Sequence, residues 1–265
     1  MKITKIKKTK HNFYEITILN SDKEEKFKLS EAYLIKYQLY SNKEIHTATY
    51  ELIKQLANQS QIYHKVLNYL SFKMRTKGEV RNYLLKHNCN ETFSTEIMEK
   101  LEKLNYLNDK QYCEAYIKQQ FDINKKGPNV IKRNLLDKEV DEKIVLECIQ
   151  TITEAKIINN IIQLISYYEK INKKKSRNQL KESILRNLLV KGYNYDCSIN
   201  AINEYQFTEN NDEFLLEQEM LKAYKRYQKK HQKYELKNRV IKSLIGKGFL
   251  YEDILNMYIS LNLEG

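Results

Sequence analysis

The chain is poor in the residues that interrupt regular structure. Among its 265 residues there is one proline, and there are six glycines and no tryptophan. Tight turns between short strands rely on proline and glycine, so this shortage argues against an all-β sandwich and against a flexible Gly/Pro-rich linker. With 42% hydrophobic and 30% charged residues, the composition favours a soluble, mainly helical protein that can bury a core.

The sequence also offers little that could hold a metal ion or carry catalysis. The four cysteines, Cys89, Cys113, Cys148 and Cys197, form no C-x-x-C pair, and His87 with Cys89 is the only close His/Cys pair. This spacing does not match a zinc site. No phosphate-binding loop of the form G-x-x-x-x-G-K-[S/T] is present. We therefore expect no enzyme, no metal and no cofactor, and four ordinary thiols.

Long hydrophobic runs are missing as well. The most apolar stretch, residues 157–168, is interrupted by Asn159, Asn160 and Gln163, and it is too short to span a bilayer. The basic N-terminus is not followed by the apolar region of a secretory signal. We expect a cytoplasmic protein without a membrane partner.

One short apolar signature recurs along the chain. Leu84-Leu85 matches Leu135-Leu136, Leu188-Leu189 and Leu244-Ile245, at offsets of 51, 53 and 56 residues. Apolar residues at helical spacing precede the later copies, and we expect them all to share one buried face. These residues are Leu180, Ile184, Leu185, Leu188 and Leu189 in the third copy and Leu236, Val240, Ile241, Leu244 and Ile245 in the fourth. Such a period is typical of helical arrays.

The repeat predicts the fold class and the domain boundaries. We expect a mainly α protein of tandem three-helix, helix-turn-helix-like modules in an elongated, curved array. The segments 3–19 and 24–30 alternate as strands do, and Ser30 is a candidate N-cap of a following helix. The predicted parts are an N-terminal β-hairpin or three-stranded cap with a helix over 1–55, and modules over 60–107, 108–152, 153–206 and 212–263.

The net charge of +12 favours contact with phosphates or with an acidic protein surface. Basic residues cluster before each signature, and Arg133, Arg186 and Lys242 each stand two residues before it. They can form a stripe along one side of the array, or simply a solvated face. The candidate partner- or DNA-binding residues are Lys73, Arg75, Lys77, Arg81, Lys125, Lys126, Arg133, Lys174, Lys175, Arg177, Arg186, Lys230, Lys233 and Lys242.

Three stretches carry a resemblance to a known family. They are "YLSFKMRTKGEVRNYLLKH" (69–87), "LNYLNDKQYCEAYI" (104–117) and "KKGPNVIKRNLL" (125–136). Together, and in this order, they resemble RecX, the bacterial regulator of the RecA recombinase, in its longer Firmicutes form. The chain departs from the family pattern at Asn88 and Glu139, which stand where glycine is usual after the second helix.

The resemblance implies a non-enzymatic regulator of recombination, DNA repair and the SOS response. Its partners would be the RecA filament and single-stranded DNA, bound with RecA or also alone. It would lower RecA ATPase, strand exchange and co-protease activity, and it would act as a monomer. The residues leave two alternatives open: a sequence-tolerant DNA-binding protein whose modules act on DNA directly, and an inert helical scaffold for another partner.

Overall fold

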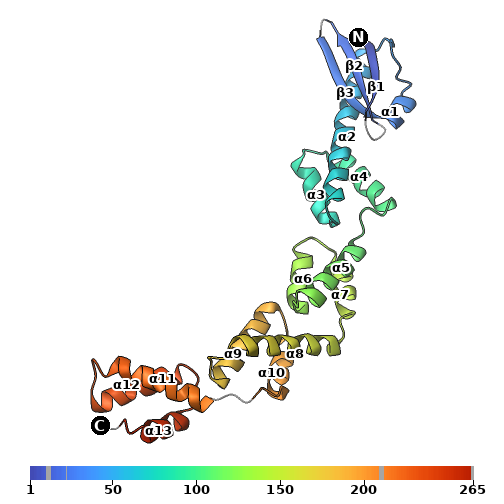
Figure 1. Cartoon of the computed structure of the whole chain (residues 1–265). Coiled ribbons are helices and arrows are strands. Elements are labelled where there is room, and N and C mark those ends of the chain that lie inside the picture. The colour runs from blue at the N-terminus through green and yellow to red at the C-terminus, as the bar shows by residue number, and fades with distance from the viewer. Residues whose placement is uncertain (10–12, 22, 209–211, 264–265) are drawn as a thin grey trace. The chain divides into compact units, whose positions relative to one another are not determined.

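The computed structural model describes residues 1–9, 13–21, 23–208 and 212–263, and most of these form helices (Figure 1). By their contacts they divide into two compact units, which are described separately. The first unit is Met1–Cys113 with Leu136–Ile144, and the second is Glu114–Leu135 with Val145–Gly265. Within the described residues, no helix has the length and hydrophobicity needed to cross a membrane.

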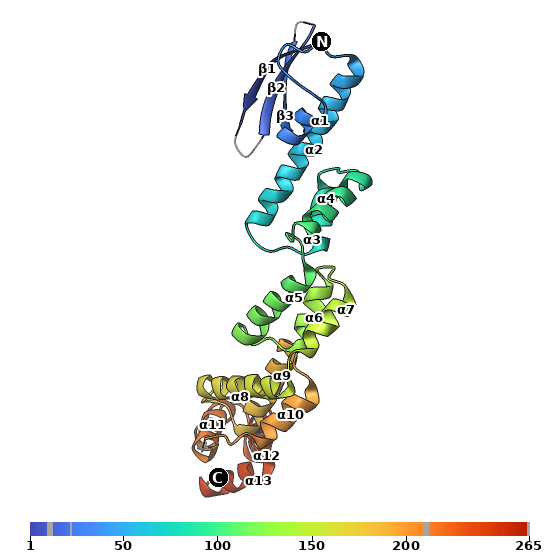
Figure 2. The same cartoon turned by 90° about the vertical axis from the view of Figure 1, so that its right-hand side faces the viewer.

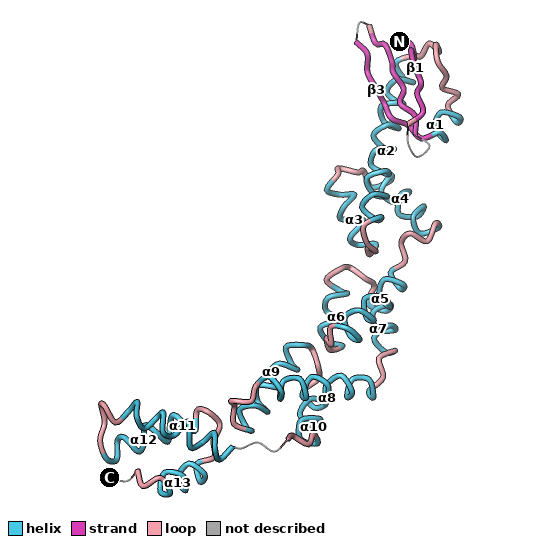
Figure 3. The backbone as a smooth tube through the Cα atoms, in the orientation of Figure 1, coloured by secondary structure: helices cyan, strands magenta, loops and turns pink. Residues whose placement is uncertain are grey.

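The N-terminal segment is a three-stranded antiparallel sheet, drawn in magenta in Figure 3. Its strands are β1 (Lys2–Lys8), β2 (Phe13–Asn20) and β3 (Lys23–Ser30), in the order β1-β2-β3. The short helix α1 (Glu31–Lys36) follows, with Ser30 at its N-cap. The predicted strands and the helix start at Ser30 are therefore confirmed.

The sheet is covered on one face by α2 (Thr47–Ser71) (Figure 2). Alternation places Ile3, Ile16 and Ile18 on that face, where all three are fully buried. From α2 they meet Tyr50 and Ile53. Burial of these side chains holds the sheet and the helix together, because a sheet of three short strands needs such a partner to be stable.

Helix α2 is long enough to contribute residues to two hydrophobic cores. Its first half belongs to the sheet core, whereas Ile62 and Val66 in its second half pack with Val80, Leu84 and further residues of the first module. The boundary predicted between residues 55 and 60 thus falls inside one continuous helix. The sequence gives no break there, because no proline or glycine interrupts the 25 residues of α2.

The tandem three-helix modules are confirmed. The first contains the end of α2 with α3 (Lys77–Lys86) and α4 (Glu91–Lys103). The second contains α5 (Asp109–Ile117), continued by the π-helical η1 (Lys118–Ile123), with α6 (Pro128–Leu136) and α7 (Glu142–Gln150). The third contains α8 (Glu154–Ile171), α9 (Arg177–Lys191) and α10 (Tyr195–Glu204), and the fourth contains α11 (Asp212–Tyr227), α12 (Lys233–Ile245) and α13 (Tyr251–Ser260).

The repeated signature lies at the end of each second helix, and its two residues behave differently. The first residue is fully buried in every copy, at Leu84, Leu135, Leu188 and Leu244. The second is exposed in three copies: Leu85 by 60%, Leu189 by 40% and Ile245 by 48%. The prediction that Leu189 and Ile245 share the core face is wrong, because successive helical residues point about 100° apart.

Each second helix is followed by a residue with a left-handed backbone. Gly192 and Gly248 have φ of 93° and 80°, and Asn88 and Glu139, which replace glycine in the first two modules, have φ of 53° and 59°. Left-handed φ ends a helix and lets the chain turn away. The four modules thus share one way of ending this helix, even where the residue is not glycine.

Candidate partner-binding surface

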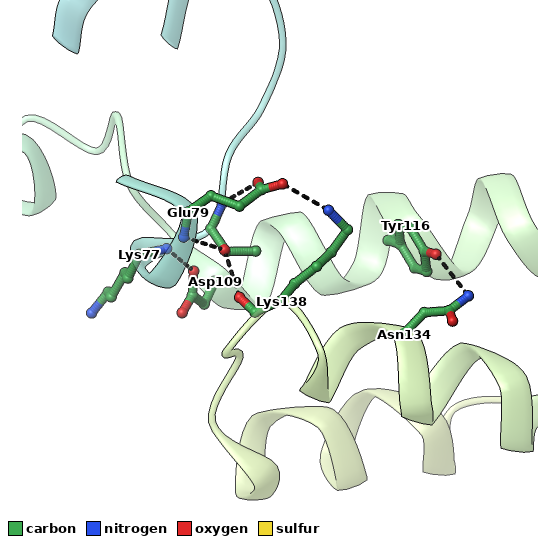
Figure 4. A network of polar contacts seen from close by, with 7 residues as sticks. Lys77, Glu79, Asp109, Tyr116, Asn134 and Lys138 are labelled. Carbon is green, nitrogen blue, oxygen red and sulfur yellow. Dashed lines mark hydrogen bonds and ion pairs between the residues drawn. The ribbon is translucent and has the colours of Figure 1, made fainter. Parts of the chain in front are cut away.

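Successive modules meet at a recurring junction. The N-terminus of one module's second helix contacts the chain just after the second helix of the next module. At the first junction Thr76 caps α3: its Oγ1 accepts from the Glu79 N–H at 3.0 Å and donates to the Lys138 carbonyl at 2.8 Å (Figure 4). The Lys77 N–H donates to Asp109 Oδ1 at 2.9 Å. The cap of one helix therefore also fastens two modules.

An ion pair strengthens this first junction. Lys138 Nζ lies 2.7 Å from Glu79 Oε1, and Glu79 also accepts from the Thr76 N–H (Figure 4). Burial raises the pKa of Glu79, but these two hydrogen bonds outweigh it and hold the pKa below its ordinary value. Burial dominates at Asp109 and raises its pKa, against the hydrogen bond from the Lys77 N–H. The pKa values of the two carboxylates at this junction are thus shifted in opposite directions, so their ionisation has opposite effects on stability.

The junction between the third and fourth modules repeats this geometry. Ser176 caps α9, and its Oγ donates to the Lys247 carbonyl at 2.6 Å. The Arg177 N–H donates to Asp212 Oδ2 at 3.1 Å, as the Lys77 N–H does to Asp109. Lys247 also pairs with Glu219, whose pKa is lowered by hydrogen bonds from Lys222 and Lys247. Ser176 and Asp212 therefore take the parts of Thr76 and Asp109.

At the middle junction, backbone N–H groups stand where the other junctions have the hydroxyl that caps the helix. The Gly127 N–H donates to the Lys191 carbonyl at 2.7 Å, and the Asn129 N–H donates to the Gly192 carbonyl at 3.1 Å. A Cβ on Gly127 would lie 2.3 to 2.5 Å from backbone atoms of Gly192 and Tyr193. Only glycine allows this approach without a shift of the backbone.

Some of the predicted basic residues form contacts with other residues of the chain. The Arg75 guanidinium lies 3.9 Å from the centre of the Tyr69 ring, and Lys77 Nζ pairs with Glu102 at 2.7 Å. Lys125 Nζ donates to Asn160, Lys175 Nζ donates to Ser183, and Arg177 Nη2 donates to the Thr208 carbonyl. These five side chains stabilise their modules, so a role in binding a partner would compete with those contacts.

The remaining candidates are available at the surface. Lys126 is half-buried, and the other members of this group are exposed: Lys73, Arg81, Arg133, Lys174, Arg186, Lys230, Lys233 and Lys242. Arg133, Arg186 and Lys242 occupy equivalent places on α6, α9 and α12 of the second unit. Asn82 holds the same place on α3 and donates to Glu139 at 2.7 Å. The structure thus leaves a recurring exposed cation on the second helix of three modules.

Apolar residues accompany these cations, and the basic pattern alone did not reveal them. Leu189 follows Arg186, and Ile245 follows Lys242, by three residues, which places each pair on neighbouring positions of one helix surface. Both apolar residues are exposed. A cation beside an exposed aliphatic side chain suits a protein surface that is both acidic and apolar better than it suits phosphate alone.

Comparison with protein families matches two consecutive parts of the chain. Residues 63–101 match a model described as "RecX, first three-helix domain", and residues 108–149 match "RecX, second three-helix domain". The first range covers the end of α2 with α3 and α4, and the second covers α5 to α7. The junction at Thr76 thus joins the two matched domains.

Curated relatives match over nearly the whole length. Proteins called "Regulatory protein RecX" from Streptococcus agalactiae serotype V and from Lactococcus lactis subsp. cremoris are 34% and 36% identical to this chain. The matches cover 96% of this chain in each case, and 97% and 95% of the relatives.

Two solved structures are similar. A structure described as regulatory protein RecX superposes with a TM-score of 0.63 at 22% identity, over 77% of this chain and 99% of that one. RecX from Lactobacillus salivarius superposes with a TM-score of 0.52 at 32% identity, over 56% of this chain and 96% of that one.

Proposed function

This chain belongs to the RecX family, and we propose that it is a non-enzymatic regulator that binds the RecA–single-stranded DNA filament and lowers RecA activity. The observation that carries the proposal is the exposed cation repeated on α6, α9 and α12, together with the aliphatic residue beside it on α9 and α12. A filament presents the same surface many times, so repeated modules on one chain can bind several of its subunits.

Repetition matters for the strength of such binding. Each module offers a small contact, and a small contact by itself binds weakly. Once one module is bound, the next binds at the effective concentration set by its link to the first. The junction at Gly127 and the junction at Ser176 fasten the second, third and fourth modules by hydrogen bonds within the second unit. This favours simultaneous contacts over independent ones.

Inhibition then requires no chemistry by the chain itself. A protein that bridges neighbouring RecA subunits favours whichever filament state fits its modules, and it slows the conformational cycle that accompanies ATP hydrolysis. The same bridging would reduce strand exchange and co-protease activity, because both depend on the filament. The chain would act as a monomer in the cytoplasm, with single-stranded DNA as a further contact.

The RecA ATPase rate on single-stranded DNA tests the proposal. We expect the rate to fall when this chain is titrated in at fixed salt, at fewer copies than one per RecA subunit. Reversing the charge of Arg133, Arg186 and Lys242 to Glu should raise the half-inhibitory concentration about tenfold or more. The matched control changes Lys2, Lys23 and Lys36, exposed residues of the N-terminal segment, to Glu and should inhibit as the wild type does.

The alternative function is direct binding to DNA, with the same basic residues on phosphates. It predicts tight, strongly salt-dependent binding to naked DNA and no dependence on RecA. An unchanged ATPase rate over a wide excess of the chain, combined with such binding, would replace the filament proposal by this alternative.

A further inference from the structure

One cavity lies outside the surface discussed above. It is a groove of about 880 Å³ between the edge strand β3, the start of β2, and α2. Cavities of this size hold ligands of the size of a nucleotide or larger. All residues that line the groove belong to the first unit, and the proposed binding to the RecA filament does not involve them.

Two rows of α2 residues line the groove. Ala57, Ser60 and His64 form the inner row, which is buried or half-buried. Lys54, Asn58, Gln61 and Lys65 form the outer row and are exposed. The spacings of three and four residues place each row along one side of the helix. The groove therefore has a recessed floor and a polar, basic rim.

Ser60 is the unusual member of the inner row. Its side chain is 4% exposed, and its Oγ has no hydrogen-bond partner among the described residues. A buried hydroxyl without a partner costs free energy, and folding gains nothing from it. A hydroxyl that lines a cavity in this state is ready to bond a polar atom of a ligand.

The floor also contains aromatic rings. Phe13 and His64 meet edge to face with their centroids 5.5 Å apart, and Phe27, which meets Tyr50 edge to face, also lines the groove. All three lining rings are half-buried, so part of each remains accessible from the groove. Nucleobases stack on such rings, with little regard to sequence.

The rim is positively charged along its length. Lys54 and Lys65 are three helical turns apart, which corresponds to roughly 16 Å along α2. Lys26 and Lys28 line the groove from β3. Among the described residues of the lining, Glu15 is the only acidic one, and its carboxylate lies 3.8 Å from Lys26 Nζ. Spread along a groove, these cations match a series of phosphates better than one phosphate group.

From these observations we propose that the groove between β3 and α2 is a nucleic-acid site, which binds nucleotides of a single strand. Bases lie against Phe13, Phe27 and His64, phosphates lie along the four lysines, and the Ser60 hydroxyl bonds a base or sugar atom. The ligand is a segment of single-stranded DNA, and a free nucleotide, which shares its chemistry, is the alternative that competition distinguishes. This site does not depend on RecA.

Photo-cross-linking tests the proposal at the groove itself. The full chain is irradiated with a labelled oligo-dT that contains 5-iodouracil, without RecA, and cross-linked peptides are identified by mass spectrometry. We expect cross-links at Phe13, Phe27 or His64. The double change K54E/K65E should reduce them about fivefold or more, whereas K23E/K36E, which alters the net charge equally, should leave them unchanged.

The variant Ser60→Ala distinguishes a role of the hydroxyl in ligand binding from a role in stabilising the fold. The variant should weaken cross-linking about threefold and leave thermal stability unchanged or slightly higher, because the hydroxyl has no partner in the fold. Competition by unlabelled oligo-dT alone would identify a strand as the source, and equal competition by thymidine monophosphate would identify a free nucleotide. Absence of cross-links in the groove at saturating oligonucleotide, or competition by poly-glutamate but not by nucleotides, would overturn the proposal.

Discussion

The junctions at Thr76 and at Gly127 fasten successive modules in the same place by different means. At Thr76 a hydroxyl caps α3 and also reaches the carbonyl of Lys138. At Gly127 the backbone of one module lies directly against the backbone around Gly192, and the Tyr193 hydroxyl donates to the nearby Lys125 carbonyl. A side-chain junction can accept a related residue, as Ser176 shows in place of Thr76, whereas a backbone junction depends on the absence of a Cβ atom.

The largest effect is expected where the two junctions differ most. Gly127→Ala places a Cβ within 2.5 Å of three backbone atoms, so the second and third modules must shift apart. We expect a loss of about 3 kcal/mol in the free energy of unfolding of this part, measured by urea denaturation. Gly246→Ala is the control, since its Cβ would meet nothing closer than 3.6 Å. Equal effects of the two changes would show that the close approach at Gly127 contributes nothing.

Loss of the hydroxyl at the other junctions should cost less. Thr76→Ala and Ser176→Ala each remove a helix cap and a bond to the next module, and we expect about 1 to 2 kcal/mol from each. Thr76→Ser should keep most of the stability because it retains the oxygen. Thr95→Ala, which removes an exposed local bond on α4, is the control. The shared design of these junctions would be contradicted if only one of the two alanine changes mattered.

Acid should weaken the first junction through Glu79. Its pKa is lower in the folded chain than in the unfolded chain, so its contribution is present above the unfolded value and disappears as the pH falls through the folded value. We expect Glu79→Gln to be less stable than the wild type by about 1 kcal/mol at pH 7, and this difference to disappear as the pH falls through the lowered folded pKa. Urea midpoints between pH 3 and pH 7 measure it. A difference that stays constant over this range would exclude the ionised carboxylate as the cause.

The opposite behaviour of Asp109 refines the same measurement. Burial raises its pKa in the folded chain, so its ionisation reduces stability as the pH rises through the folded value. Asp109→Asn keeps an oxygen that can accept from the Lys77 N–H and removes this ionisation. Its stability relative to the wild type should therefore increase with pH, whereas that of Glu79→Gln should decrease.

The smallest expected effect concerns the residue after each second helix. Glu139 holds φ of 59° without the freedom of glycine, so Glu139→Gly should stabilise the chain by about 0.5 kcal/mol. Asn82→Ala removes the same exposed bond between Asn82 and Glu139 without changing this backbone, and it is the control. If Glu139→Gly destabilised the chain more than Asn82→Ala does, the contacts of the Glu139 side chain would contribute more to stability than the strain of its positive φ costs.

Much of this fold follows from the sequence because its signals are local. The repeated apolar pairs and the alternation in the first thirty residues each reflect neighbours in the chain, and these features predicted the modules and the sheet. The resemblance to RecX rests on the same short stretches, and the relatives confirm it.

The junctions could not be predicted in this way, because Thr76 and Lys138 are 62 residues apart and no periodicity links them. The basic residues show the same limit. Their clustering was visible, but the pairing of Lys77 with Glu102 depends on how α3 and α4 pack. The exposed Leu189 and Ile245 looked like core residues, since the pattern alone does not show which of two adjacent apolar residues faces inward.

Binding to the filament tests the central claim most directly. Equilibrium binding of the labelled chain is measured on a preassembled RecA–single-stranded DNA filament and on the same DNA without RecA, over a series of salt concentrations. We predict tighter binding to the filament at every salt concentration, and a loss of about tenfold when Arg133, Arg186 and Lys242 are changed to Glu. Equal binding to filament and naked DNA, or wild-type binding by the triple variant, would contradict the claim that the repeated second helices bind the filament.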